Sequence, residues 1–171
     1  VEATIEKFGQ VDILVNNAGV YGPKGAIEDV NWEEWARTIE INLFGSIFMC
    51  QAVLPHFKAQ GGGKIVQLSG GGATSPMPRI SAYAASKTAV IRFIESLAEE
   101  VRDYHIDVNA IAPGALNTRL LDEVLEGSST YISSEESIAI FWGLHNFPSS
   151  KPSGKGFYGT YLAPTYLMGE W

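Results

Sequence analysis

Val11-Asp12-Ile13-Leu14-Val15, followed directly by Asn16-Asn17-Ala18-Gly19, is the stretch of sequence from which the fold is first predicted. Four of the first five residues are aliphatic and lack helical spacing, which favours a strand buried on both faces. The small and polar residues after them favour a loop at the carboxyl end of that strand. The stretch therefore predicts one strand of a parallel sheet.

Further strands are predicted along the chain. Residues 64–68 and 107–112 are short apolar runs that end in Gly-rich or Pro-Gly loops, and a last strand is expected near 158–163. Because the strands alternate with helical patterns, they predict an α/β fold with a parallel sheet. Ligands of such sheets bind at the carboxyl ends of the strands, where these loops lie.

The helices between the strands have clear signals. Asn31 followed by Glu34 three residues later is a capping-box pattern, and it predicts a first long helix that ends before Gly61. A second helix is predicted over residues 81–104, with an apolar stripe on one side. A further helix is expected near 134–142.

The composition predicts a soluble globular chain. Its 171 residues, 46% hydrophobic and 18% charged, fit one domain over residues 1–171. The net charge of −7 argues against nucleic acid and against an anionic membrane as partners, because both bind basic surfaces. No run of about 18 apolar residues stands out, so no membrane-spanning helix is expected.

Cysteine and histidine usage points to a reducing compartment without a metal centre. The single cysteine, Cys50, excludes an internal disulfide and favours a cytoplasmic location, and its apolar neighbours predict a buried thiol. His56, His105 and His145 lack metal-ligand spacing, so no metal site is predicted. Residues 1–8 read as a helix without an N-cap, and we expect the chain to begin inside an element.

The segment Tyr83-Ala84-Ala85-Ser86-Lys87 carries the clearest chemistry. Residues four apart on a helix lie on one face, so the phenol of Tyr83 and the ammonium of Lys87 are expected side by side. An adjacent positive charge favours the phenolate, and we therefore expect the pKa of Tyr83 to fall towards the working range. A tyrosine beside a lysine also occurs by chance on helix surfaces, so the pair alone is weak evidence.

Four motifs in order resemble those of the short-chain dehydrogenase/reductase family. They are Asn16-Asn17-Ala18-Gly19, the Asn-x-x-Gly segment of residues 42–45, Tyr83-x-x-x-Lys87, and Pro-Gly-x-x-x-Thr at residues 113–118. The resemblance covers residues 1–122 strongly and the C-terminal third only loosely. It implies a Rossmann-type doubly wound parallel sheet, of which this chain holds the C-terminal part.

The resemblance also implies a function and a set of site residues. The enzyme would interconvert a secondary alcohol and a ketone with NAD or NADP, with Tyr83 as general acid/base and Lys87 bound to the nicotinamide ribose. Asn42 would distort its helix so that a backbone carbonyl holds a water in a proton relay. The other residues expected to line the cofactor cleft are Asn16, Ala18, Gly19, Pro113, Gly114 and Thr118. A homodimer or homotetramer is expected, through the long helices.

The serine that orients the substrate in this family would fall at position 70, where this chain has glycine. Ser69 is one residue early, and the flexible glycines after it favour Ser69 as the substitute in the site. Ser75 and Ser81 are weaker substitutes. If none of the three hydroxyls reaches the substrate, the loss of one donor predicts a rate lower by about two orders of magnitude.

A second departure is the missing phosphate cradle. Neither glycine cluster, at 61–63 or 70–72, has the spacing of the glycine-rich turn that binds a diphosphate at a helix N-terminus. We therefore expect this sequence to lack the first half of the nucleotide fold. Two alternatives stay open: a non-catalytic dinucleotide-binding protein, and a sugar-nucleotide epimerase or dehydratase, which shares the Tyr-x-x-x-Lys pattern.

Overall fold

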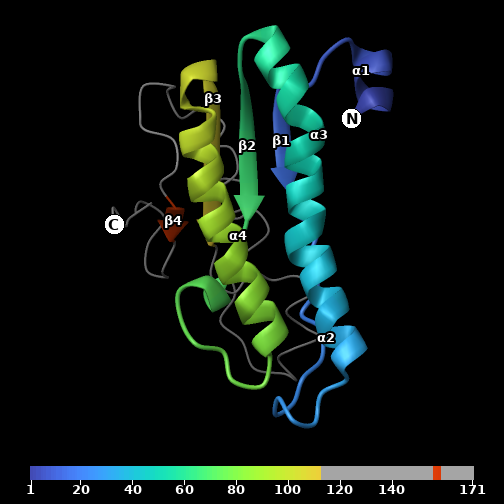
Figure 1. Ribbon diagram of the computed structural model, residues 1–171, viewed down its shortest axis with the longest axis vertical. Coiled ribbons are helices and arrows are strands. Elements are labelled where there is room, and N and C mark those ends of the chain that lie inside the picture. Colours follow the sequence, from blue (N-terminus) through green and yellow to red (C-terminus); the bar gives the residue numbers. More distant parts are fainter. Residues whose placement is uncertain (113–155, 159–171) are drawn as a thin grey trace, which may run out of the picture.

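The computed structural model describes residues 1–112 and the backbone of residues 156–158, as an α/β sheet with helices packed on it (Figure 1). The sheet has the order β1-β2-β3-β4, and every neighbouring pair is parallel. Its strands are β1 (Ile13–Asn16), β2 (Gly63–Leu68), β3 (Ile106–Ala112) and β4 (Gly156–Tyr158). The predicted α/β fold with a parallel sheet is confirmed, and the first three strands begin within two residues of their predicted positions.

The two long helices cover the same face of the sheet (Figure 1). Each connection joins neighbouring parallel strands in the same direction, and right-handed crossovers then place both helices on one side. Leu14, Ile65 and Val108 lie side by side on three strands, and their side chains are buried in the core beneath these helices. Val15, on the opposite face, is 44% exposed. Burial on both faces, as expected from the sequence, is therefore not seen for β1 within the described residues.

The first long helix consists of three consecutive parts. They are α2 (Trp32–Ile39), a π-helical turn η1 (Glu40–Phe44) and α3 (Gly45–Gln60). Asn31 caps the start, since its side chain accepts a hydrogen bond of 3.0 Å from the Glu34 backbone N–H. Gly61 ends it in the left-handed conformation at φ 88°. The predicted start of this helix, with its N-cap at Asn31, and its predicted end before Gly61 are confirmed.

The stretch Trp32–Gln60 is long and apolar enough to span a membrane by length and composition, with a mean hydropathy of 1.3 in its most apolar window. The sequence-based expectation that no such helix exists was therefore too strong. Cys50, Val53 and Phe57 of this stretch are buried in the core of the domain. Core packing therefore accounts for part of its apolar character.

The second long helix, α4 (Ser81–Glu100), ends four residues before its predicted end at Tyr104. A 3-10 turn η3 (Arg102–Tyr104) follows, and His105 has the left-handed φ of 56°. This reversal turns the chain directly into β3, and so it shortens the helix. Two minor elements complete the described chain: α1 (Glu2–Phe8), as predicted, and the 3-10 turn η2 (Gly71–Ala73).

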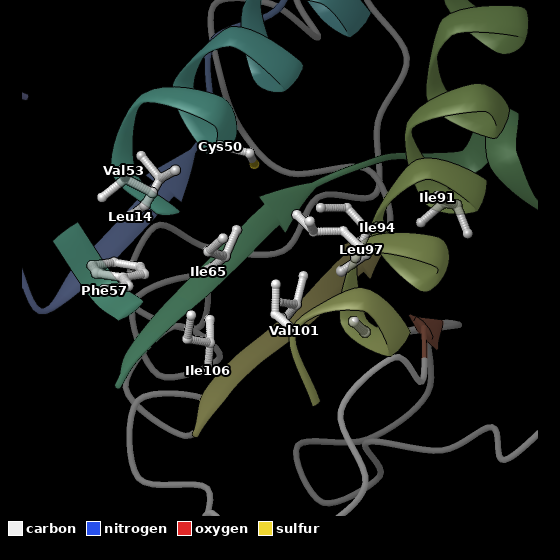
Figure 2. Packing of buried hydrophobic residues seen from close by; sticks show 13 residues of the cluster. Leu14, Cys50, Val53, Phe57, Ile65, Ile91, Ile94, Leu97, Val101 and Ile106 are labelled. Carbon is white, nitrogen blue, oxygen red and sulfur yellow. The ribbon is translucent and has the colours of Figure 1, made fainter. Parts of the chain in front are cut away.

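The core lies between the sheet and the two long helices (Figure 2). Val53 and Phe57 of α3 pack with Leu14 and Ile65, while Ile94 and Leu97 belong to α4. These contacts fix α3 and α4 against the sheet. The helix predicted near 134–142 and the remainder of the strand predicted near 158–163 lie outside the described residues.

Candidate active site

Tyr83 and Lys87 lie one turn apart near the start of α4, and both are buried, with 6% and 5% exposure. The Lys87 Nζ is 5.7 Å from the centroid of the Tyr83 ring. It donates a hydrogen bond of 3.0 Å to the backbone carbonyl of Leu68, at the end of β2. The predicted placement of the pair on one helix face is confirmed, and Lys87 ties that face to the sheet.

The Tyr83 hydroxyl is surrounded by Tyr21 and Gly70. The Tyr21 and Tyr83 rings have centroids 4.4 Å apart and tilt by 36°, and their side chains share a hydrogen bond. A Cβ added to Gly70 would lie 2.2 Å from the Tyr83 hydroxyl oxygen. The hydroxyl thus occupies the space that a side chain at position 70 would fill.

Burial controls the ionisation of the pair. It lowers the pKa of Lys87 from 10.5 to about 8. Burial, followed by the neighbouring Tyr21, raises the pKa of Tyr83 above its ordinary value. The expected fall in the pKa of Tyr83 is therefore wrong for this structure, because desolvation outweighs the ammonium, which is held at the Leu68 carbonyl.

Asn42 fastens the loop after β1 to the helices. Its amide accepts a hydrogen bond of 2.8 Å from the Val20 N–H and donates one of 2.9 Å to the Val20 carbonyl. It also donates to the Ser86 hydroxyl at 2.9 Å, and Ser86 in turn donates to the Tyr83 carbonyl at 2.8 Å. Asn42 therefore connects this loop with the turn of α4 that carries Tyr83.

The helix is distorted at Asn42, as predicted, since Asn42 lies inside the π-helical turn η1. Its backbone carbonyl accepts a hydrogen bond of 3.2 Å from the Ser46 hydroxyl. The water relay from this carbonyl remains a prediction. Ser86 was not singled out from the sequence, although a small polar residue inside the Tyr83–Lys87 segment was a usable signal.

The loop after β1 approaches the pair through Gly19. A Cβ on Gly19 would lie 3.2 Å from the Asn42 Oδ1 and 3.3 Å from the Lys87 Nζ, so its hydrogen allows the close approach. Ala18 is exposed beside it. The buried Asn16 instead donates to the Ser46 carbonyl and the Cys50 sulfur, so its side chain holds β1 to α3.

Ser69 lies in the same region but is directed elsewhere. It is 5% exposed, and its hydroxyl donates a hydrogen bond of 2.9 Å to the backbone carbonyl of Lys87. This bond joins the end of β2 to α4. The structure does not place the Ser69 hydroxyl on Tyr83, the contact expected of a substitute for the serine at position 70.

Three predicted cofactor residues, Pro113, Gly114 and Thr118, lie outside the described residues. Within residues 1–112, no group of three or more His, Cys, Asp or Glu side chains could hold a metal ion. Cys50 is 1% exposed, and burial raises the pKa of its thiol to about 11. The predicted buried thiol is confirmed.

A family model described as short chain dehydrogenase matches residues 1–129 of this chain. The chain belongs to the short-chain dehydrogenase family. It is 41% identical over 122 residues to a 3-ketodihydrosphingosine reductase of Bacteroides thetaiotaomicron, covering 71% of this chain and 45% of that protein. The chain thus spans less than half the length of this curated relative.

Solved structures of short-chain dehydrogenases share the fold. The 3-ketoacyl-(acyl-carrier-protein) reductase from Brucella melitensis complexed with NADH is 30% identical, with a TM-score of 0.84 over 92% of this chain and 69% of that one. ElxO with NADP bound is 26% identical, with a TM-score of 0.84 over 92% of this chain and 68% of that one. The Rossmann-type fold follows from these matches together with the parallel sheet.

The described residues fit a nicotinamide dinucleotide at the carboxyl ends of β1 and β2. The Lys87 ammonium has three N–H donors, and Leu68 is its acceptor within the described part of the chain. Gly19 has no side chain and so leaves room for close contact beside the Lys87 ammonium. Ala18, which precedes it in the same loop, is exposed. These groups suit the hydroxyls of a ribose, while the glycine-rich phosphate turn is absent from this sequence.

Proposed function

We propose that this chain forms the proton-transfer part of an NAD- or NADP-dependent oxidoreductase that interconverts a secondary alcohol and a ketone. The proposal rests mainly on the buried Tyr83–Lys87 pair, which lies beside a loop anchored by Asn42. The bound nicotinamide would supply or accept the hydride. Relatives with bound NADH and NADP support either dinucleotide.

The protonated phenol of Tyr83 is the form that the reduction of a ketone needs. Because burial raises the pKa of Tyr83, the phenol keeps its proton at neutral pH and can act as a general acid. Its O–H bond breaks as the proton passes to the carbonyl oxygen of the ketone, while the hydride bonds to the carbonyl carbon. The product is the alcohol, and the phenolate left at Tyr83 has the Lys87 charge nearby.

The remaining features of the proposal are less specific. The substrate would be a small molecule, and the enzyme would act in the cytoplasm as a homodimer or homotetramer without a nucleic acid or a membrane as partner. The excess of acidic residues speaks against a nucleic acid or an anionic membrane as partner, and the single buried cysteine supports a reducing compartment such as the cytoplasm.

The test is turnover of the full-length protein on a panel of ketones and secondary alcohols, followed by the absorbance of reduced nicotinamide. We expect Tyr83→Phe, which keeps the ring, to lower kcat by about 100-fold or more, because the proton donor is lost. Tyr104→Phe, at an exposed tyrosine, is the matched control. Unchanged turnover in Tyr83→Phe would contradict the mechanism.

A second candidate function is dinucleotide binding without catalysis. Gly70 in place of a serine, together with the engagement of Ser69 by the Lys87 carbonyl, favours it. It would be supported if NADH or NADPH binds, as shown by calorimetry, while no compound of the panel is turned over.

A further inference from the structure

Position 70 is a glycine, where the family resemblance implies a serine, so one hydroxyl group is missing near Tyr83. Gly70 has an extended backbone, with φ 178° and ψ 179°, a conformation open to any residue. What excludes a side chain there is space, because its Cβ would lie 2.2 Å from the Tyr83 hydroxyl oxygen. Neither Gly70 nor Ser69, which bonds the Lys87 carbonyl, gives the Tyr83 hydroxyl a side-chain partner.

Tyr21 gives the Tyr83 hydroxyl such a partner. The two side chains share a hydrogen bond, and their rings lie 4.4 Å apart between centroids. Tyr21 is only partly buried, whereas Tyr83 is buried. The contact joins segments that are separated by 62 positions in the chain (83 − 21).

The loop that carries Tyr21 is fixed on both sides. Val20, before it, is held by the two hydrogen bonds of the Asn42 amide, at 2.8 and 2.9 Å. Gly22, after it, has φ 72° and packs so closely on the buried Thr38 that a Cβ would overlap its hydroxyl. Tyr21 is therefore presented to Tyr83 by a backbone that is anchored at each neighbouring residue.

We propose that Tyr21 is a positioning residue, whose hydroxyl holds the Tyr83 hydroxyl in place for proton transfer, and that Gly70 provides the space for this arrangement. The inference rests on the proposed function, because it concerns the same proton donor. Holding a donor within reach of the reacting oxygen matters strongly, since a displacement of about 1 Å costs on the order of 100-fold in rate.

The first test compares Tyr21→Phe with Tyr104→Phe in the full-length protein. Tyr21→Phe keeps the ring and removes the hydroxyl. We expect kcat to fall by about 10-fold to 100-fold, with the KM values of substrate and cofactor changed by less than about threefold. Tyr104→Phe is expected to keep the wild-type kcat. A kcat in Tyr21→Phe within twofold of wild type would overturn the proposal.

The second test asks whether a hydroxyl at position 70 replaces the missing one. In the Tyr21→Phe background the Tyr83 hydroxyl has lost its partner and can yield to a side chain at 70. We expect Gly70→Ser in that background to recover about tenfold in kcat, whereas Gly70→Ala recovers nothing. Equal effects of the two substitutions would show that position 70 acts by space alone. They would overturn the inference that a hydroxyl at position 70 can replace the hydroxyl of Tyr21.

A readout independent of activity separates this inference from the proposed function. The chemical shift of the Tyr83 ζ carbon, followed by NMR with isotopically labelled tyrosine and assigned with Tyr83→Phe, reports the hydrogen bonding of its hydroxyl. We expect Tyr21→Phe to shift this signal and Tyr104→Phe to leave it unchanged. A protein without turnover would defeat the proposed function, while an unmoved signal would defeat the role of Tyr21.

Discussion

At the scale of single residues, Lys87 is the most informative group because it is a buried cation. Burial lowers its pKa from 10.5 to about 8, so below pH 8 the folded chain holds a charged ammonium that water would solvate better. The shift corresponds to a destabilisation on the order of 3 kcal/mol at neutral pH. The site therefore keeps this charge at a cost in stability.

This cost predicts how stability depends on pH. Between about pH 8 and 10.5 the unfolded chain binds a proton at Lys87 that the folded chain does not. The contribution of Lys87 to the free energy of unfolding therefore becomes more favourable to the folded state as pH rises. Lys87→Met should be the more stable protein at pH 7, by about 1 to 3 kcal/mol, and its advantage should shrink above pH 8. Urea unfolding at a series of pH values measures the difference.

The difference between the two proteins is the quantity to follow. Burial also raises the pKa of Cys50 to about 11 and that of Tyr83, and both groups make the folded state lose stability at high pH. These contributions are common to both proteins and cancel. A stability difference that stays constant from pH 7 to 10 would contradict the buried-cation interpretation.

At the scale of elements, Asn42 joins three segments from inside the π-helical turn η1. Removing its side chain leaves the Val20 N–H and carbonyl and the Ser86 hydroxyl without this partner. An unsatisfied buried group costs about 1 to 3 kcal/mol, so Asn42→Ala should lower the free energy of unfolding by about 3 kcal/mol or more. The matched control, Asn31→Ala at the exposed helix cap, should cost about 1 kcal/mol. Denaturant unfolding compares the two variants. Equal losses in the free energy of unfolding would argue against the role of Asn42 in joining the three segments.

A second prediction concerns the packing of η2 on α4. A Cβ on Gly72 would lie 2.7 Å from the Ala84 Cα, which is backbone and cannot turn aside. Gly72→Ala should therefore push η2 away from α4 and lower the melting temperature by several degrees. Gly71→Ala is the neighbouring control, because its Cβ would meet nothing within 4 Å. Calorimetric melting curves that coincide for both variants would refute this contact.

At the scale of the whole molecule, α3 and the end of η1 carry apolar side chains that the described residues leave uncovered. Phe48 is 63% exposed, with Phe44 at 44% and Met49 at 40% beside it. If the long helices form a subunit contact, as the family resemblance implies, Phe48→Glu should shift the full-length protein towards monomer, because a charge would be buried at the contact. Light scattering measures this. A wild-type protein that is monomeric at all concentrations would refute the oligomer.

Much of the fold could be predicted from local patterns. The strands near residues 13, 64 and 107 were recognised because buried parallel strands are short continuous apolar runs. The end of α4 was missed by four residues, since helical spacing continues to Tyr104 and only the left-handed His105 reverses the chain. The single covered face of β1 also escaped prediction, because an apolar run does not tell which side a helix will cover.

The sequence by itself determined the strand-helix order, the cap at Asn31, and the shared face of Tyr83 and Lys87. Each of these depends on residues within a few positions of one another, whose geometry the backbone fixes. Only the tertiary structure decided the neighbours of the Tyr83 hydroxyl: Tyr21 beside it, Gly70 against it, and Ser69 bonded elsewhere. It also decided that burial raises the pKa of Tyr83, because desolvation depends on how distant segments pack around the phenol.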